Sequence, residues 1–568
     1  MPTTSNQKRS VGVGSGLALM LAAAIVYWPV LRAFLIDDDF LLLAFARLLR
    51  DPLALFAHEH FSIGPYFRPL SMSLWWASAH LFGNAIRPQY VLNLCLHVGV
   101  SLALWHLLRT ATRLPRASFL LALMFATHPI AIGTASWLSD RFDLLCSLFA
   151  LLAMRLALEY RRAPSSARLF GTIALCSCAV LSKETGLAAA VAVIVMWLPA
   201  FGAHGRNHAR AAAAAMALAV VAWIMWRAQV AGAAALPYGQ VPLTSLLWQG
   251  GISELAYFAS NLTGWARLSA VGRIALCTAV AAFAAGLGMT MMQPRSASGP
   301  SRERRVLCAA ALLAAMAAIA MQAPITYTWR VQFVPAMDVN AIVSNSRLFY
   351  FPLCCIMILA SLACSSIWDG RSVIPQRARA LLVAAVTIAI AAWSVQAHKL
   401  ARDFRRRTIV PRELILAAVD AVARAPHASA DCHVYLLGIG YGIEENVLKT
   451  LPDAVVKALI GDLAAIQNCL LQSEQAAWLN LVGGVPLSAA TAEPLTPAYG
   501  NGLPLPWLQV GGVQVVYLDL PASVDARAIP QAVFLARFGD RFEDVTAQIR
   551  SGERRVQFFC ARASPYCR

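Results

Sequence analysis

The sequence predicts a polytopic α-helical membrane protein of about eleven transmembrane helices, followed by a small soluble α/β domain. Three observations support this prediction. The 568 residues are 59% hydrophobic and only 13% charged, with a mean hydropathy of +0.60. Apolar runs long enough to cross a bilayer recur along residues 1–400, and short clusters of Lys and Arg separate them, as in cytoplasmic loops. Residues 401–568 are more polar and mix strand-like with helix-like segments.

The net charge of +18 does not indicate nucleic-acid binding, because the basic residues lie mostly in the clusters between apolar runs. Nine of the 13 cysteines fall within apolar runs. The four others, which allow three pairings, are Cys432, Cys469, Cys560 and Cys567. The first ten residues are short and polar, and the apolar run after them is long, so we expect a retained first helix rather than a cleaved signal peptide.

The first apolar run, Val11–Phe34, ends just before three adjacent acids, Asp37, Asp38 and Asp39. Two basic residues precede the run, so the helix should carry the chain outward and deliver the acids to the outer membrane surface. Adjacent acids at that place have two interpretations. They either stop and anchor the helix at the interface, or they serve a reaction there.

We expect residues 37–87 to form one outer loop, with an interfacial helix at Leu70–Phe82 that is too short to cross. The run 169–201 would be about 50 Å long as one helix, against about 30 Å of hydrocarbon. Two short helices are therefore expected there, joined by an outer hairpin at Lys183 and Glu184. Residues 232–268 are predicted to be a second outer loop. The other predicted crossings are 88–108, 119–136, 142–160, 211–231, 270–292, 306–322, 348–368 and 380–397.

This topology places the C-terminal domain outside the cytoplasm, on the periplasmic side of a bacterial inner membrane. The basic linker 293–305 favours it, whereas the basic cluster at Lys399–Arg407 favours the inverted arrangement, which follows if residues 250–268 cross. Within the domain, strands are predicted at 434–438 and 513–520 and a helix at 455–479. The domain shows no nucleotide-binding loop, zinc-ligand spacing or serine-hydrolase motif, which favours an accessory or acceptor-contacting role.

The predicted topology gathers polar residues from five loops or helix ends at the outer face. They are Asp37, Asp38, Asp39, Arg68, His128, Asp140, Arg141, Asp143, Lys183, Glu184 and Arg347. Loop composition alone would give some such set. A mixture of acids and bases at one membrane face nevertheless suits a reaction between a lipid-phosphate donor and a hydroxyl acceptor. A carboxylate can take the acceptor proton, and Arg or Lys can hold the departing phosphate.

The order of motifs resembles the C-type glycosyltransferase superfamily, over roughly residues 10–400. More narrowly, it is similar to the protein O-mannosyltransferase-like members, including the transmembrane O-mannosyltransferases that carry tetratricopeptide repeats. The motifs are Asp38-Asp39-Phe40, Tyr66-Phe67-Arg68-Pro69-Leu70, Leu81-Phe82-Gly83, Asn93 through His97, His128-Pro129, Trp137 through Asp143, Lys183-Glu184 and Arg347-Leu348-Phe349-Tyr350-Phe351-Pro352. Two departures are the lack of 34-residue helical repeats after the membrane part and the α/β segment in their place.

The resemblance implies an enzyme that takes a sugar from a polyprenyl-phosphate carrier on the extracytoplasmic face and inverts its anomeric centre. It implies a general base at Asp38 or Asp39, and Asp38 is favoured. The additional acid Asp37 makes the alignment with the family's acidic pair ambiguous. By the same resemblance, the candidates for holding the carrier phosphate are Arg68, Lys183 and Arg347. The residues that would shape the cavity or contact substrate are His128, Asp140, Arg141, Glu184 and Tyr350. The acceptor is a lipid, a glycan or a protein.

No cofactor is required by the sequence. A divalent metal could bridge acid and phosphate, but no ligand set demands one. Structural alternatives stand beside several assignments: Asn93 and His97 suit interhelical hydrogen bonding, Asp140 and Arg141 a local ion pair, and Arg347 snorkelling. Three other functions also remain open. They are a polymerase or ligase of lipid-linked glycans, a transporter or flippase for lipid-linked sugars, and a membrane scaffold without catalysis.

Overall fold

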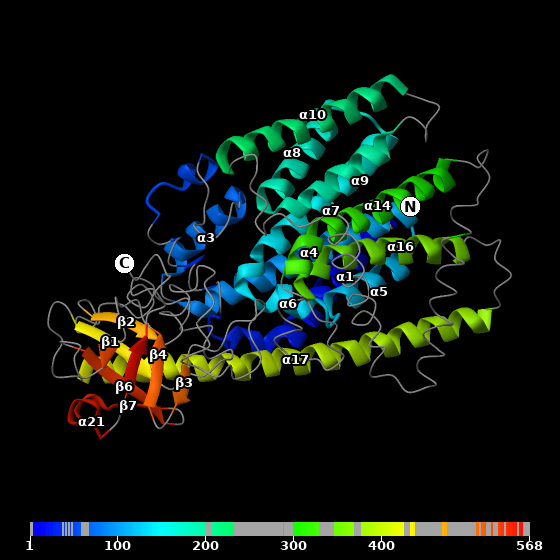
Figure 1. Ribbon diagram of the computed structural model, residues 1–568. Coiled ribbons are helices and arrows are strands. Elements are labelled where there is room, and N and C mark those ends of the chain that lie inside the picture. Colours follow the sequence, from blue (N-terminus) through cyan, green and yellow to red (C-terminus); the bar gives the residue numbers. More distant parts are fainter. Residues whose placement is uncertain are drawn as a thin grey trace. The chain divides into compact units, whose positions relative to one another are not determined.

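The computed structural model (Figure 1) describes residues 4–36, 39, 42–43, 46, 49–57, 67–83, 85–198, 206–231, 288, 299–328, 346–368, 376–424, 432–437, 469–473, 507–510, 513–517, 524–525, 532–538, 541–553 and 556–559. The chain divides into two compact units. Unit 1 comprises Met1–Leu31, Asp51–Leu74 and Gln89–Arg402. Unit 2 comprises Arg32–Arg50, Trp75–Pro88 and Asp403–Arg568.

Helices form nearly all of the described part of unit 1. The longer ones are α1 (Thr4–Tyr27), α3 (Pro69–Phe82), α4 (Ile86–Thr112), α5 (Pro115–Ala126), α7 (Arg141–Arg162), α8 (Ser166–Ser182), α9 (Leu187–Trp197), α10 (Arg206–Ala231), α14 (Gly299–Thr328), α16 (Tyr350–Trp368) and α17 (Gln376–Arg424). Parts of α3, α4 and α17 belong to unit 2. The short ones are α6 (Ala131–Ser136) and the 3-10 turns η1 (Trp28–Arg32), η2 (Pro52–Phe56), η3 (Leu138–Asp140), η4 (Glu184–Gly186) and η8 (Arg347–Phe349).

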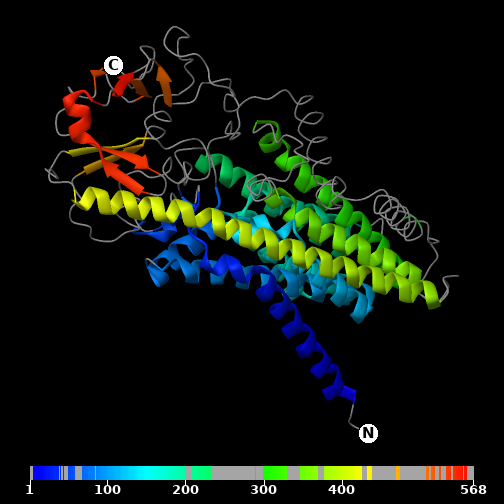
Figure 2. The same cartoon turned by 90° about the horizontal axis from the view of Figure 1, so that it is seen from below.

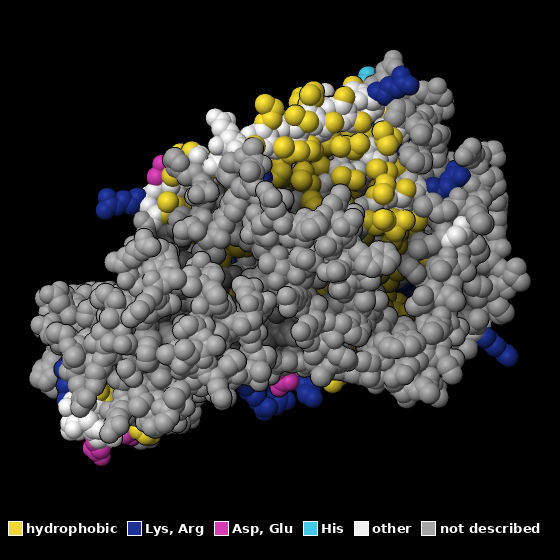
Figure 3. All heavy atoms as spheres, viewed as in Figure 1, with side chains coloured by type: hydrophobic (Ala, Val, Ile, Leu, Met, Phe, Trp, Pro, Cys, Tyr) yellow, Lys and Arg dark blue, Asp and Glu magenta, His cyan; other side chains and the backbone are white. Residues whose placement is uncertain are grey.

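Six of the described helices are long and apolar enough to cross a membrane, by length and composition. They are Gly14–Arg32, Ile86–Thr112, His208–Val230, Glu303–Ala323, Arg347–Ser365 and Val383–Arg406. Their outer faces are apolar: on α10, Leu218 is 69% exposed and Met225 68%. Figure 3 shows hydrophobic side chains gathered over helices α8 to α10. Apolar surface of this kind suits lipid rather than water, so the chain is an integral membrane protein.

The predicted crossing at 119–136 is wrong as a continuous helix. The chain instead forms α5, which ends at Ala126, and then the short helix α6. The break lies at His128-Pro129: proline has no N–H to give a helix, and its ring disfavours helical conformation in the residue before it. At about 18 Å, α5 is too short to cross the roughly 30 Å of hydrocarbon by itself.

The predicted break within 169–201 is confirmed. Helix α8 ends at Ser182, Lys183 is extended with φ −161° and ψ 148°, and α9 begins after the turn η4. Gly186 lies against the backbone of the helix before it. A Cβ at this position would come within 2.4 Å of the Ala179 carbonyl carbon and 2.5 Å of the Val180 nitrogen. The chain therefore folds back tightly on α8, and only glycine fits the approach.

Helix α1 joins the other helices of unit 1 at its C-terminal half. Leu19 packs with Trp105 of α4 and with Ala122 and Ala126 of α5 in a small buried cluster. Tyr27 donates a hydrogen bond to the His128 carbonyl oxygen at 3.3 Å. In Figure 2 the N-terminal part of α1 runs away from these helices. Packing thus fixes the end of α1 that leads toward the three acids.

The described C-terminal part of unit 2 contains two four-stranded sheets and the short helix α21 (Thr546–Ser551). One sheet has the order β2 (Cys469–Ser473), β1 (Cys432–Leu437), β6 (Ala532–Phe538), β7 (Arg541–Asp544), with β1 parallel to both β2 and β6. The other has the order β3 (Trp507–Val510), β4 (Val513–Tyr517), β8 (Val556–Phe559), β5 (Val524–Asp525).

Strands β1 and β4 overlap the two strands predicted at 434–438 and 513–520. The helix predicted over 455–479 is wrong at its end, because Cys469–Ser473 is strand β2. Pairing with β1 overrides the local preference of this segment, since a parallel partner is contributed from far away in the chain. The predicted loop 232–268 and crossing 270–292 lie outside the described residues, apart from Gly288.

Candidate functional site

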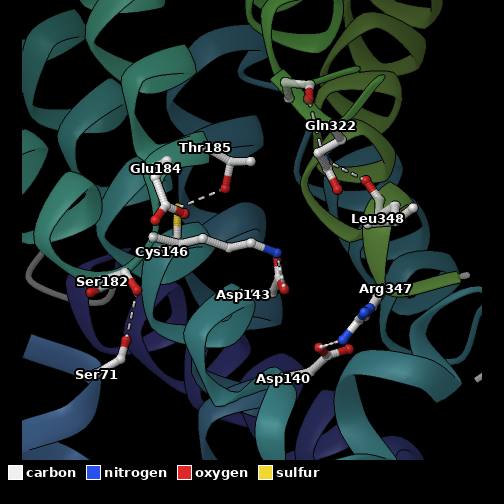
Figure 4. Close-up of polar contacts among 12 residues, drawn as sticks. Ser71, Asp140, Asp143, Cys146, Ser182, Glu184, Thr185, Gln322, Arg347 and Leu348 are labelled. Atoms are coloured by element: carbon white, nitrogen blue, oxygen red, sulfur yellow. Dashed lines mark hydrogen bonds and ion pairs between the residues drawn. The ribbon is translucent and has the colours of Figure 1, made fainter. Parts of the chain in front are cut away.

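Three pairs of cation and carboxylate lie at helix ends in unit 1 and join segments that are far apart in the sequence. The pairs are Arg68 with Glu184, Lys183 with Asp143, and Arg347 with Asp140. Figure 4 shows Glu184, Asp143, Asp140 and Arg347 in one region of the helical unit. We call these six residues the ion-pair cluster. All six belong to the polar set that the sequence gathered at the outer face.

The pair of Arg68 and Glu184 is bidentate. Arg68 directly precedes α3, and its Nε lies 3.2 and 3.0 Å from the two carboxylate oxygens of Glu184. Its Nη2 lies 2.9 Å from Oε2. The guanidinium also lies over the ring of Phe142, 5.1 Å from the centroid. Nearby, Ser71 of α3 donates to the Ser182 carbonyl oxygen at 3.0 Å, so α3 is tied to the end of α8 at two points.

The pair of Lys183 and Asp143 is the most buried. Lys183 Nζ lies 2.6 Å from Asp143 Oδ2, and the two side chains are 7% and 5% exposed. Asp143 is in the first turn of α7, where a carboxylate is favoured by the helix dipole. The extended backbone of Lys183 ends α8. Burying both charges costs desolvation free energy, which the short contact and further hydrogen bonds must offset.

The pair of Arg347 and Asp140 has the longest separation of the three. Arg347 Nη1 lies 3.5 Å from Asp140 Oδ1, and the Arg347 side chain is 26% exposed. Its guanidinium lies over the Trp137 ring, 4.4 Å from the centroid. Burial raises the pKa of Asp140 to about 8, and the charge of Asp143 adds to that rise, while the Arg347 and Lys183 charges oppose it. Asp140 lies in η3, outside the six candidate spans.

Arg141 is fully buried and is held by amides of α4. Its Nε donates to Asn93 Oδ1 at 2.8 Å, and its Nη2 donates to Gln89 Oε1 at 3.0 Å. Asn93 Nδ2 in turn donates to the Trp137 carbonyl oxygen at 3.1 Å. These bonds clamp η3 and the start of α7 onto α4, and they set the direction of the residues between Trp137 and Asp143. Arg141 therefore positions the ion-pair cluster.

Two residues that the sequence assigned to the site make their contacts elsewhere. His128 Nδ1 accepts from the Ile130 N–H at 3.1 Å, and its ring meets the ring of Trp393 at 4.6 Å. Tyr350 is fully buried, and its hydroxyl lies 2.7 Å from His97 Nδ1. The structure thus places both in contacts between helices. It does the same for His97, whose Nε2 lies 3.0 Å from the Ala126 carbonyl oxygen.

The three acids of the first outer loop are described only in part. Asp37 and Asp38 lie outside the described residues. Asp39 belongs to unit 2, where it is fully buried. Its Oδ2 accepts from the Ile36 N–H at 3.2 Å, and its own N–H donates to the Ile36 carbonyl oxygen at 3.0 Å. This is one half of a capping box: the Asp39 carboxylate satisfies the Ile36 N–H, whereas Ile36 has no side-chain acceptor to return the bond, so Asp39 has a local structural role.

Sequence reasoning missed the roles of Asp143 and Gln89. Asp143 appeared only as one polar residue of the outer face, yet it follows Asp140 by three positions and so shares a helix face with it. Gln89 lies four residues before Asn93, which lies four before His97, so the three form one polar stripe on α4. The helical spacing of these residues could have indicated from the sequence that they share a face. Among the described residues, no group of three or more His, Cys, Asp or Glu could hold a metal ion.

No protein-family model matches the sequence, and no curated protein is similar to it in sequence. Among solved structures, an oligosaccharyltransferase from Archaeoglobus fulgidus, in complex with Zn and sulfate, overlaps 82% of this chain and 64% of its own with a TM-score of 0.45 and 12% identity. The archaeal oligosaccharyltransferase AglB from the same organism, in complex with an inhibitory peptide and a dolichol-phosphate, overlaps 83% of this chain and 66% of its own, with a TM-score of 0.43 and 12% identity.

ArnT from Cupriavidus metallidurans, bound to undecaprenyl phosphate, overlaps 84% of this chain and 92% of its own, with a TM-score of 0.43 and 12% identity. This chain spans less than two thirds of the length of the archaeal proteins. Likenesses at this level, with TM-scores below 0.5, do not establish which family the chain belongs to.

Proposed function

We propose that this protein is a membrane glycosyltransferase, which moves a sugar from a polyprenyl-phosphate carrier to a hydroxyl acceptor outside the cytoplasm. The single observation that carries the proposal is the ion-pair cluster. Three cations from separate segments come together at helix ends, and each has a carboxylate as partner. A phosphate can replace a carboxylate as the partner of Arg or Lys, because both are anions that accept charge-assisted hydrogen bonds.

The proposed reaction is a single displacement that inverts the anomeric centre. An oxygen of the acceptor hydroxyl attacks the anomeric carbon, and the bond from that carbon to the phosphate oxygen breaks. The bonding electrons leave with the carrier phosphate, which Arg68, Lys183 and Arg347 stabilise as its charge grows. The acceptor proton goes to a carboxylate of the first outer loop. Asp38 is the proposed base, because the carboxylate of Asp39 already accepts a backbone N–H.

The resemblance in sequence motifs supports a finer proposal. It comprises C-type glycosyltransferase architecture with about eleven crossings over residues 1–400, hexosyl or mannosyl transfer of the protein O-mannosyltransferase-like kind, and a bacterial inner-membrane location. Residues 401–568 would then be a periplasmic domain that contacts the acceptor. The acceptor is a lipid, a glycan or a protein, since the segment that follows the membrane part differs from the helical repeats of the repeat-bearing members.

A membrane assay tests the proposal. Membranes that contain the full chain are incubated with a panel of radiolabelled undecaprenyl-phosphate sugars, and the label is followed into lipid, glycan and protein fractions. We expect transfer from at least one donor by the wild type and none by Arg68→Ala. An Arg116→Ala variant is the matched control, because Arg116 lies near the start of α5 and outside the ion-pair cluster. Equal transfer by all three proteins would contradict the proposal.

A further inference from the structure

A second group of polar residues includes Trp137 and shares Asp140 and Arg347 with the ion-pair cluster. It consists of Ser136, Trp137, Asp140, Ser346 and Arg347, and we call it the Trp137 cluster. Arg347 ties the group together, because its guanidinium lies 4.4 Å from the centre of the Trp137 ring and 3.5 Å from Asp140 Oδ1. Ser136 and Ser346 are the chain neighbours of Trp137 and Arg347.

Four side chains of the Trp137 cluster have polar atoms that make no hydrogen bond to any residue the structure describes. The atoms are Trp137 Nε1, Asp140 Oδ2 and the hydroxyl oxygens of Ser136 and Ser346. All four side chains are at least nine-tenths buried. Leaving one buried polar group unbonded costs about 1–3 kcal/mol, so native proteins seldom place several together without a ligand or water to bond them.

The chemistry of these atoms suits a sugar better than a phosphate. The indole N–H donates, the two hydroxyls donate or accept, and Asp140 Oδ2 accepts when ionised. Sugar hydroxyls also donate and accept, so they can satisfy all four atoms. Phosphate oxygens mainly accept, so they cannot serve both the donors and the acceptors of this group, as sugar hydroxyls do. The face of the Trp137 ring provides an apolar surface for the C–H groups of a sugar ring.

Arg347 covers that ring face with a partly exposed side chain. Its 3.5 Å separation from Asp140 exceeds the 2.7–3.2 Å range of a normal N–H···O hydrogen bond, and its side chain is 26% exposed. We propose that the Trp137 cluster binds the transferred sugar after Arg347 has moved from Trp137 to the carrier phosphate. This inference rests on the proposed function, because it needs a donor that carries phosphate and sugar side by side.

Binding measurements on the full chain in lipid nanodiscs test the inference. The probes are undecaprenyl phosphate, undecaprenyl-phosphate mannose and undecaprenyl-phosphate glucose. We expect at least one sugar-bearing carrier to bind more tightly than the bare carrier. Trp137→Phe and Ser136→Ala should each reduce that preference about 5- to 10-fold, the effect of losing one hydrogen bond, and should leave the affinity for undecaprenyl phosphate unchanged.

Trp105→Phe is the matched control. Trp105 is also buried, its indole N–H also makes no hydrogen bond among the described residues, and Arg109 lies over its ring at 5.2 Å. It packs in the cluster of Leu19 and Ala122, away from the ion pairs. We expect its sugar preference to equal that of the wild type. An equal loss in Trp105→Phe would mean that the effect is one of general stability, and the inference would fall.

Two further outcomes would overturn the inference: sugar-bearing and bare carriers bind equally to the wild type, or the preference persists in both Trp137→Phe and Ser136→Ala. Failure of the proposed function looks different. Transfer by the wild type with an unchanged preference in the variants removes the inference and leaves the function. A preference that depends on Trp137, with no transfer to any acceptor, removes the function and leaves a sugar-binding site.

Discussion

For Lys183 and Asp143, an effect on stability can be distinguished from an effect on sugar transfer. Their pair is short, at 2.6 Å, and nearly excluded from solvent. A buried pair of this kind is weak evidence for stability, because a well-packed apolar pair of similar volume often stabilises a protein as well or better. The pair can serve either the specificity of helix packing or the proposed chemistry, and substitutions separate the two roles.

Lys183→Met should destabilise the protein by about 3–5 kcal/mol, because it leaves the Asp143 carboxylate buried without its partner. The double variant Lys183→Met with Asp143→Leu should recover most of that stability, since no unpaired charge remains. It should still lack transfer activity if Lys183 holds the carrier phosphate. Thermal unfolding of the purified protein and the membrane transfer assay measure the two effects. An active, stable double variant would assign the pair a purely structural role.

Asp140 should give the donor affinity a dependence on pH. Burial raises the pKa of Asp140 to about 8, so the carboxyl is mostly neutral at pH 7 and ionises as the pH rises past 8. Once ionised, Asp140 pairs more strongly with Arg347 and competes with the carrier phosphate. The donor KM of the wild type should therefore rise several-fold between pH 7 and pH 9. In Asp140→Asn the rise should be absent; the same slope in both proteins would contradict this account.

Residue types in the sequence identified the members of the ion-pair cluster but not their partners. The selected residues are charged and lie in predicted outer loops or at outer helix ends: Arg68, Lys183, Glu184, Asp140 and Arg347. Which carboxylate each cation meets depends on how distant helices pack, and one sequence does not contain that information. For His128 and Tyr350, the motifs indicated a place in the site, but both side chains contact other helices. The His128 ring packs against Trp393, and the Tyr350 hydroxyl lies against His97.

At the scale of elements, the length of apolar runs predicted most helices of the membrane part. The failures lie at a proline and at a strand that pairs with a distant segment. The break between α8 and α9 followed from a run too long for one crossing. The break between α5 and α6 was missed, although Pro129 marks it in the sequence. The crossing was predicted from the length of the apolar run, and that criterion does not take the helix-breaking effect of proline into account. Strand β2 was missed because its partner β1 is contributed from a separate part of the chain.

The turn between α8 and α9 gives an element-scale prediction. Gly186→Ala should prevent the tight fold-back, because the new Cβ would meet the backbone of Ala179 and Val180 at 2.4–2.6 Å, and backbone atoms cannot move aside cheaply. The variant should express poorly or unfold at a clearly lower temperature. Gly99→Ala is the matched control, since its Cβ would meet only Leu148 side-chain atoms at 3.7 Å or more. Equal stability of the two variants would refute the fold-back.

Helix α17 belongs to unit 1 up to Arg402 and to unit 2 from Asp403. Its 49 residues span about 73 Å, more than twice the hydrocarbon thickness, so it must extend well beyond the bilayer if it crosses. The sequence predicted only its N-terminal part, 380–397, because the apolar run ends at the basic cluster that follows, whereas the helix continues through that cluster. In this segment the end of the apolar run therefore does not mark the end of the helix.

At the scale of the whole molecule, the side of the membrane that holds the C-terminal domain decides the redox state of its cysteines. Cys432 and Cys469 are direct partners in the register of parallel strands β1 and β2. Neighbouring strands lie about 4.8 Å apart, within the Cα separation that a disulfide tolerates. A periplasmic domain should therefore contain this disulfide, because that compartment is oxidising.

Mass spectrometry of alkylated, unreduced protein measures the prediction, and an alkaline phosphatase fused after Arg568 measures the topology independently. We expect a linked Cys432–Cys469 peptide and an active phosphatase. Two reduced thiols together with an inactive phosphatase would mean that the domain is cytoplasmic, as the basic cluster Lys399–Arg407 favours. The crossings assigned after residue 250 would then be inverted.

Sugar transfer by paired substitutions in the first outer loop tests the central claim most directly. Radiolabelled undecaprenyl-phosphate sugars are supplied to membranes that contain the wild type, Asp38→Asn or Asp39→Asn, and folding of each variant is checked by its thermal transition. Transfer should disappear in Asp38→Asn with the fold intact, while Asp39→Asn should keep both the fold and transfer, because the Asn amide oxygen can still accept from the Ile36 N–H. Full transfer by both variants would contradict a carboxylate base in this loop, and with it the proposed mechanism.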